Sequence, residues 1–327
     1  KGFNIQSKSS DPVPFAQEKT NDPWVGSWAS GGNLNTARYG LFTTGSQTAA
    51  ITTGGEGSAP NPKAETETYN GSAWSEVSDL NTARQYGVTF GTTTAAIFGS
   101  GQIPPGQTGV VESWNGASWT EVADVPARDI ATGFGTATAG LIAAGRSSPP
   151  SNVVATVQSW NGASWTEVGD LSTARYALMG SGVQTSGIAY GGRNSSNAKV
   201  ANVESWNGSS WTETTEINTA RYAGGGAGVS NASALLFGGN TNPPDATSAL
   251  TESWDGSSWT EVADLATTRY FQSGNAGTAT SSITAGGLPI PGSALTATEE
   301  WSFTGIPPSA PAVGYSDSIV GDMYYNS

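Results

Sequence analysis

Six arginines recur at nearly even spacing and form the most regular set of ionisable groups in the chain. Each one ends a tripeptide such as Thr-Ala-Arg, and successive copies lie 46, 44, 47, 46 and 48 residues apart. They are Arg38, Arg84, Arg128, Arg175, Arg221 and Arg269. A ring of guanidinium groups could bind an anionic ligand, such as an acidic sugar or a sulfate, because the planar fork of Arg matches oxyanions.

Acidic residues near the arginines favour a structural role instead. One acid precedes nearly every arginine by four or five residues, and a glutamate recurs slightly earlier in the same repeats. These acids are Asp79, Asp124, Asp170, Glu216 and Asp264, together with Glu76, Glu121, Glu167, Glu213 and Glu261. Buried arginine needs such partners. We therefore expect ion pairs within or between repeats, and the anion-binding ring is the alternative.

The side chains that most catalytic and metal sites require are missing. The chain contains no histidine and no cysteine, which removes the commonest general base and the commonest zinc ligands. We therefore expect no cofactor, no metal site and no enzymatic activity. A glycosidase needs only two carboxylates about 5–10 Å apart. It stays a minor alternative, with the non-repeating acids Glu56, Asp129 and Asp245 as candidates.

Charge and hydropathy narrow the classes of partner. The formal net charge is −13, with only 13 basic residues. Such a balance argues against the basic surface that nucleic-acid binding needs and against attraction to anionic membranes. No apolar run approaches the roughly 18 residues of a membrane-spanning helix. We expect neither nucleic-acid binding nor membrane insertion.

The arginines belong to a longer repeat that predicts four short strands per unit. In the first unit these begin with residues 39–44, followed by 49–55, which end in paired glycines. A later strand such as 110–114 ends in an aromatic residue, and Asn115-Gly116 then predicts a tight hairpin leading to 119–122. Repeats of about 40–50 residues that consist of short strands are typical of β-propeller blades.

Tryptophans flank the predicted hairpins at a constant spacing of five residues. The pairs are Tyr69/Trp74, Trp114/Trp119, Trp160/Trp165, Trp206/Trp211 and Trp254/Trp259. Regular placement at strand ends indicates that they pack between neighbouring blades, since buried aromatic rings contribute large apolar surfaces. The predicted structural aromatics are Trp28, Trp74, Trp119, Trp165, Trp211, Trp259 and Trp301, and Trp24 is expected beside Trp301.

The two ends of the repeat array complement each other. The sixth unit stops after its third strand, at Trp301, whereas residues 24–28 supply a fourth strand that follows no other three. We expect these segments to pair and to close a ring, which leaves no open edge at the junction. The predicted fold is all-β, a six-bladed β-propeller of four-stranded antiparallel blades. Residues 24–305 form it, between a leader or linker at 1–23 and a C-terminal linker or tail at 306–327.

The order of motifs resembles the kelch repeat. Paired glycines, an aromatic residue, a tryptophan and then an arginine that opens the next inner strand recur over about residues 24–303. The units with Ser100-Gly101 and Ala144-Gly145 lack the glycine pair, and we expect an altered backbone there. The kelch-type enzyme galactose oxidase holds copper through His, Tyr and a Cys–Tyr crosslink, which this chain cannot reproduce.

The amino-acid sequences of the repeats are similar to those of kelch-type proteins from marine bacteriophages. Residues 34–40 (LNTARYG) and 113–124 (SWNGASWTEVAD) show the likeness, and residues 320–327 are similar to short segments in phage fibre and appendage proteins. The resemblance implies a non-enzymatic virion appendage, fibre or capsid-decoration protein, at the virion surface or outside the cell. Its implied partners are host-surface glycans or other virion proteins, and the flanking segments would support a homo-oligomer. A cellular or secreted kelch-type interaction scaffold is the alternative.

One face of the predicted propeller varies from unit to unit. The loops after the glycine pairs differ in every copy, whereas the Asn-Gly hairpins on the opposite face are nearly identical. The variable loops are residues 56–63, 102–109, 146–155, 193–202, 240–249 and 288–295. Variable loops on a regular scaffold commonly carry binding sites. We therefore predict that this loop face, which also carries the arginine connections, is the binding face.

Overall fold

The computed structural model describes residues 26–303, except 58–60, 148–151, 242–245, 273 and 275. The leader at 1–23, the tail at 306–327, Trp24 and Asp245 lie outside the described residues. Within the described ranges the regular secondary structure consists of β-strands. No helix long and apolar enough to cross a membrane occurs in this part of the chain.

Four-stranded antiparallel sheets are the unit of the fold, and four of them are separate sheets. Within each sheet the strands lie side by side in the order in which they occur in the chain. The four sheets are β6 (Val88–Gly91), β7 (Ala96–Gly99), β10 (Val111–Trp114) and β11 (Trp119–Val122); β13 (Thr132–Thr136), β14 (Ala139–Ala143), β17 (Val157–Trp160) and β18 (Trp165–Val168); β20 (Met179–Val183), β21 (Ser186–Tyr190), β23 (Val203–Trp206) and β24 (Trp211–Thr214); and β26 (Gly225–Ser230), β27 (Ser233–Phe237), β30 (Thr251–Trp254) and β31 (Trp259–Val262).

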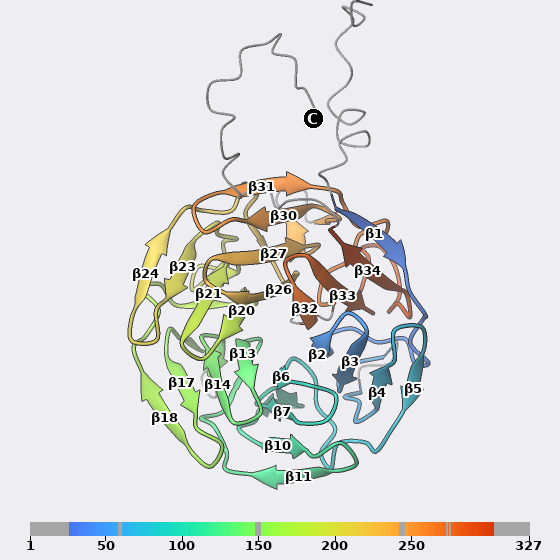
Figure 1. The fold of residues 1–327 in the computed structure, drawn as a ribbon. Helices are drawn as coiled ribbons and strands as arrows, with labels where there is room; N and C mark the ends of the chain where they lie inside the picture. Colours follow the sequence, from blue (N-terminus) through green and yellow to red (C-terminus); the bar gives the residue numbers. More distant parts are fainter. Residues whose placement is uncertain are drawn as a thin grey trace, which may run out of the picture.

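An eight-stranded sheet contains two further sets of four strands. One set is β2 (Phe42–Ser46), β3 (Ala49–Thr53), β4 (Thr66–Tyr69) and β5 (Trp74–Glu76), and the other is β32 (Ala276–Thr278), β33 (Ser281–Ala285), β34 (Thr298–Ser302) and β1 (Ser27–Ser30). A single parallel pair, Gly45 with Ala276, joins the two sets. Figure 1 shows all the sets arranged around a common centre, with β2, β6, β13, β20, β26 and β32 innermost. The fold is therefore all-β and propeller-like.

Short strands form small two- and three-stranded sheets in addition to these. They are β8 (Gln102–Ile103), β9 (Gly106–Gln107), β12 (Arg128–Asp129), β15 (Arg146–Ser147), β16 (Asn152–Val153), β19 (Arg175–Tyr176), β22 (Arg193–Asn194), β25 (Arg221–Tyr222), β28 (Asn240–Thr241) and β29 (Ala246–Thr247). β12, β19 and β25 begin at arginines, β8, β15, β22 and β28 directly follow the glycine-pair positions, and β9, β16 and β29 pair with strands of the second kind. Their pairing places the arginine connections and the variable loops on the same face.

The first strand pairs with the last, as the sequence predicts. β1 runs antiparallel to β34, with Trp28 opposite Trp301 and Ser30 opposite Glu299. The Trp28 Nε1 donates a hydrogen bond to the Thr251 Oγ1 at 3.1 Å. Trp74 and Trp119 make the same kind of bond from their fourth strands, to Thr298 and Thr66. β1 therefore occupies the place of a fourth strand beside β34.

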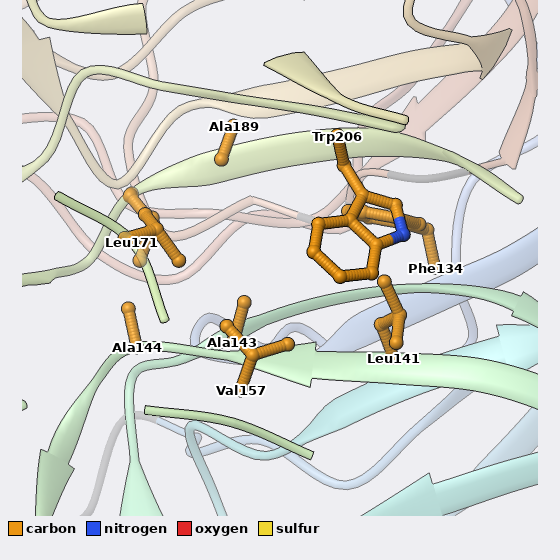
Figure 2. Close-up of a cluster of buried hydrophobic side chains, with 9 residues drawn as sticks. Phe134, Leu141, Ala143, Ala144, Val157, Leu171, Ala189 and Trp206 are labelled. Atoms are coloured by element: carbon orange, nitrogen blue, oxygen red, sulfur yellow. The ribbon is translucent and has the colours of Figure 1, made fainter. Parts of the chain in front are cut away.

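The hydrophobic core lies between neighbouring sheets. Figure 2 shows Phe134, Leu141 and Val157 of one sheet facing Trp206 of the next. The sheets approach closely because small residues separate the large ones. A Cβ on Gly187 would lie 2.3 Å from the Phe134 ring. The alternation of large apolar and small residues along each strand therefore decides how closely adjacent sheets pack.

The predicted structural tryptophans pack between or within the sheets. Trp74, Trp119, Trp259 and Trp301 are buried, whereas Trp28, Trp165 and Trp211 are half-buried. The third-strand tryptophans at the start of four of the hairpins are also buried, at 1–2 % exposure. They are Trp114, Trp160, Trp206 and Trp254.

The two units without a glycine pair keep the same backbone conformation, so the expected alteration is wrong. Ser100 has φ of 59° and Ala144 has φ of 62°, close to the 62° of Gly191 at the equivalent position. Left-handed backbone costs a non-glycine residue roughly 1–2 kcal/mol. The surrounding hydrogen bonds hold Ser100 and Ala144 in this conformation despite that cost.

Candidate functional site

The six predicted arginines are buried, at 0–2 % exposure. Five of them form ion pairs with a glutamate on the third strand of their own unit, at 2.6–2.9 Å. The pairs are Arg38–Glu67, Arg84–Glu112, Arg175–Glu204, Arg221–Glu252 and Arg269–Glu299. An anion at these guanidinium groups would have to displace a buried glutamate.

The ion pairs use different acids from those that the sequence suggested. The fourth-strand glutamates and the acids that precede the arginines are exposed. Asp79 and Asp264 accept hydrogen bonds from the amides of Thr66 and Thr251 at 3.2 and 3.1 Å. They therefore hold the start of the third strand, and the arginine partner is a glutamate within that strand.

Each glutamate also binds the backbone of the arginine connection. In the unit that begins at Arg175, one Glu204 oxygen accepts from the guanidinium and the other from the Ser172 amide at 2.6 Å. Arg175 also donates to the carbonyls of Gly191 and Asn202 at 2.9 and 2.7 Å. The pair thus ties the connection, the glycine pair and the third strand together.

Arg128 is the exception, because Gln158 stands where the other units have glutamate. Arg128 donates instead to the carbonyls of Ala144 and Thr156 and to the Thr156 hydroxyl. Burial lowers its pKa to about 10. The connection before it is one residue shorter, and Pro126 has no amide N–H to offer a carboxylate. The glutamate and its backbone donor are therefore absent from the same unit.

Two sets of backbone hydrogen bonds join the units around the axis. At one equivalent position in each unit, a residue with positive φ donates its amide to the carbonyl of its counterpart in the preceding unit at 2.7–2.9 Å. These residues are Gly40, Tyr86, Ile130, Ala177, Ala223 and Phe271, and Gly40 donates to Phe271. In the second set, the last residue of each glycine pair donates to the next unit's arginine carbonyl, and Gly287 donates to Arg38.

A ring of cross-strand pairs surrounds this axis on the loop face, and we call it the collar. Each pair joins the residue after an arginine to the residue after a glycine pair. The pairs are Tyr39–Glu56, Gln85–Gln102, Asp129–Arg146, Tyr176–Arg193, Tyr222–Asn240 and Tyr270–Leu288. The sequence analysis missed the collar as a set, although the residue after the glycine pair changes between most copies; tyrosine follows the arginine in four of the six units.

Aromatic rings cover one part of the collar. Phe271 lies with its ring centroid 5.0 Å from Tyr86 and 4.9 Å from Tyr270, and Tyr222 lies 6.2 Å from Phe271. These rings are half-buried, so each keeps part of its surface toward solvent. Such a surface can pack against the apolar face of a ligand and hydrogen-bond through the phenol groups.

Basic side chains stack on the neighbouring tyrosines. The Arg193 guanidinium lies 3.9 Å from the centroid of Tyr222, and Lys199 lies 5.5 Å from the same ring. Arg146 lies 5.4 Å from the centroid of Tyr176. Cations over aromatic faces gain stability from the ring quadrupole. This part of the collar therefore presents ordered positive groups.

Two of the three non-repeating acids lie in the collar, each with fixed partners. Asp129 is buried and accepts two hydrogen bonds from Arg146, at 3.0 and 2.9 Å, while burial raises the pKa of its carboxyl. Glu56 accepts from the Tyr86 hydroxyl at 3.4 Å. Burial, together with Glu56, raises the pKa of Tyr39 to about 12. These carboxylates thus bind collar side chains.

The opposite end of the axis holds a cavity of about 150 Å³ on the hairpin face. Its lining includes Phe90, Phe134, Val183 and Val229, together with inner-strand glycines. Val229 is 55 % exposed, which places an apolar side chain at the mouth of this cavity. The two ends of the axis therefore differ in chemistry, because the collar is aromatic and charged.

Comparison with known proteins finds no relative that suggests a function, so the functional argument rests on the geometry of the structure. No protein-family model matches the chain, and no curated protein matches it. Within the described ranges, no group of three or more His, Cys, Asp or Glu residues could hold a metal ion.

Replacing Glu204 with glutamine should destabilise the protein strongly. Glu204→Gln leaves the Arg175 guanidinium buried without its counter-ion, so we expect the free energy of unfolding to fall by about 3 kcal/mol. Glu213→Gln is the matched control, because Glu213 is exposed and should change stability by less than about 0.5 kcal/mol. Urea denaturation followed by tryptophan fluorescence measures both. Equal effects would show that the third-strand glutamate is not the essential partner.

Alkaline pH should weaken the fold through its tyrosines. Burial raises the pKa of Tyr39 and of Tyr69 to about 12, helped by Glu56 and Glu300 respectively. An unfolded phenol titrates near pH ~10. The folded state therefore holds these protons longer, and its stability should fall as pH rises from about 10 toward about 12.

Urea midpoints at about pH 8 and about pH 11 check this prediction, with phenolate absorbance as a second signal. Tyr39→Phe should make the fall with pH shallower, because that phenol no longer titrates. A midpoint that stays constant over this range would contradict the prediction.

Proposed function

We propose that the chain is a six-bladed kelch-like β-propeller, closed by β1, which acts as a non-enzymatic binding module through its collar. The pairing of β1 with β34 supports closure at the junction. Both sets of backbone hydrogen bonds also return to their starting unit, through Gly40 with Phe271 and Gly287 with Arg38. Each of six arginine-containing units contributes one bond to each set.

The variation of the collar pairs from unit to unit carries the binding proposal. The buried arginines, the third-strand aromatics and the hairpin turns recur from unit to unit, as packing requires. The collar pairs differ in charge, size and aromaticity on the same backbone frame. Binding residues are commonly placed on loops that a rigid scaffold positions.

We propose a virion appendage, fibre or capsid-decoration protein as the setting of this module. The resemblance of the repeat sequences to phage proteins favours a location at the virion surface or outside the cell, with host-surface glycans or other virion proteins as partners. The carboxylates of Glu56 and Asp129 bind collar side chains and so do not favour a glycosidase. Mass spectrometry of purified particles tests the setting, and absence of the chain from them would contradict it.

Hydrogen exchange tests closure of the ring. If β1 completes the last blade, amides of Ser27–Ser30 that bond to β34 should exchange as slowly as those of Trp211–Thr214 in another fourth strand. Trp28→Ala should accelerate exchange in β1 and β34 while leaving β23 and β24 protected. Fast exchange of β1 in the unmodified chain would rule out the closed ring.

Binding to a glycan array tests the use of the collar. Tyr222→Ala removes an aromatic surface from the loop face, whereas Val229→Ser changes an exposed residue on the hairpin face. We expect the first variant to lose ligands that the second retains, because only the first alters the proposed site. The reverse result would move the binding site to the hairpin face.

A further inference from the structure

The accessible basic side chains of the described chain gather in one arc of the collar. Ten arginines and lysines lie in the described ranges, and six of them are the buried arginines. The other four are Lys63, Arg146, Arg193 and Lys199. Arg146 and Arg193 occupy the same position in successive units, directly after Ala144-Gly145 and Gly191-Gly192, and Lys199 pairs with Arg193 across a β-bridge. Three of the four thus lie together.

The arc is preorganised by contacts with its neighbours. The Arg193 guanidinium stacks on Tyr222 and donates to the Asn197 Oδ1 at 2.9 Å. The hydroxyl of Tyr176 donates to the same oxygen. The Lys199 ammonium lies 5.5 Å from the centroid of the Tyr222 ring and donates to the Asn240 Oδ1 and to the Thr241 carbonyl. A guanidinium stacked on an aromatic ring keeps its N–H groups in the plane parallel to that ring, where an oxyanion can approach them. Little side-chain entropy remains to be lost on binding.

An aromatic surface continues directly from the basic arc. Tyr222 belongs to both, since it lies under Arg193 and beside Phe271, and Phe271 contacts Tyr270. A ligand that fits both parts needs a negative group and, next to it, a flat face with apolar C–H bonds. A sugar ring that carries a carboxylate or sulfate has this combination.

The charge of the rest of the protein favours one site for such a ligand. The formal net charge is −13. The fourth-strand glutamates, including Glu121, Glu167 and Glu213, are exposed on the outer strands. An anion is therefore repelled from the outer rim, and the arc is where accessible positive groups concentrate. Its binding should weaken as salt rises, because exposed charges are screened.

We propose that Arg193 and Lys199 hold the carboxylate or sulfate of an acidic saccharide whose ring packs on Tyr222 and its aromatic neighbours. This inference rests on the proposed function and names the ligand class of the collar. It also moves anion recognition from the six buried arginines to Arg193 and Lys199, which lie outside that set.

Three polymers with one backbone test the ligand class: dextran, carboxymethyl-dextran and dextran sulfate. We expect both charged polymers to bind in titration calorimetry and neutral dextran not to bind. Arg193→Gln and Lys199→Gln should each weaken binding about 10-fold or more, since each removes a charged hydrogen-bond donor. Lys63→Gln is the matched control, because Lys63 is a half-exposed cation beside Glu65 outside the arc, and it should leave affinity unchanged. Thermal melting verifies that each variant folds.

The outcomes separate this inference from the proposed function. Binding of only one charged polymer identifies the acidic group and supports the inference. Binding of neither charged polymer, equal binding of neutral dextran, or equal loss in Lys63→Gln would overturn it. If the glycan array then shows neutral ligands that Tyr222→Ala abolishes, the collar remains the binding site and only the acidic ligand is wrong. If Val229→Ser alone abolishes binding, both proposals fail.

Discussion

The burial of one arginine guanidinium in each unit is the constraint on which the rest of the structure depends. In five units a buried third-strand glutamate neutralises it, and Arg38, Arg175 and Arg269 also donate to one carbonyl of the glycine pair and one just before the third strand. A buried charge without its counter-ion costs several kcal/mol. Each pair therefore fixes the arginine connection against its own sheet. Arg128 differs, because its unit has Gln158 in place of the glutamate and a shorter connection. Its guanidinium is bound only by uncharged oxygens, including the Ala144 carbonyl and the Thr156 hydroxyl.

Because backbone hydrogen bonds join the units, the side chains on the loop face can differ from unit to unit. The bonds from Gly287 to Arg38 and from Ala177 to Ile130 need only an amide, a carbonyl and the correct backbone conformation. Side chains at the collar take no part in these bonds. Their identity can therefore differ from unit to unit while the scaffold stays constant, which is the arrangement that a binding surface on a rigid frame requires.

Much of the fold was predictable because it depends on local patterns. The Asn-Gly turns, the four strands per unit and the pairing of residues near Trp28 with those near Trp301 follow from turn chemistry and from counting strands. The arginine partner was not predictable in this way. Glu204 and Glu213 lie opposite each other on paired strands, and only the packing of the connection that carries Arg175 makes the first buried and leaves the second exposed.

The sequence by itself determined the four long strands of each unit and their order, the absence of histidine and cysteine chemistry, and the face on which the loops vary, because repeats and turn signals are local. The tertiary structure alone decided which acids neutralise the arginines, that Ser100 and Ala144 keep left-handed backbone, and that the collar residues meet. Residues such as Tyr222 and Arg193 lie in different units, far apart along the chain. They are in contact only because the units pack around one axis, and no local sequence pattern predicts the distance between the Arg193 guanidinium and the Tyr222 ring.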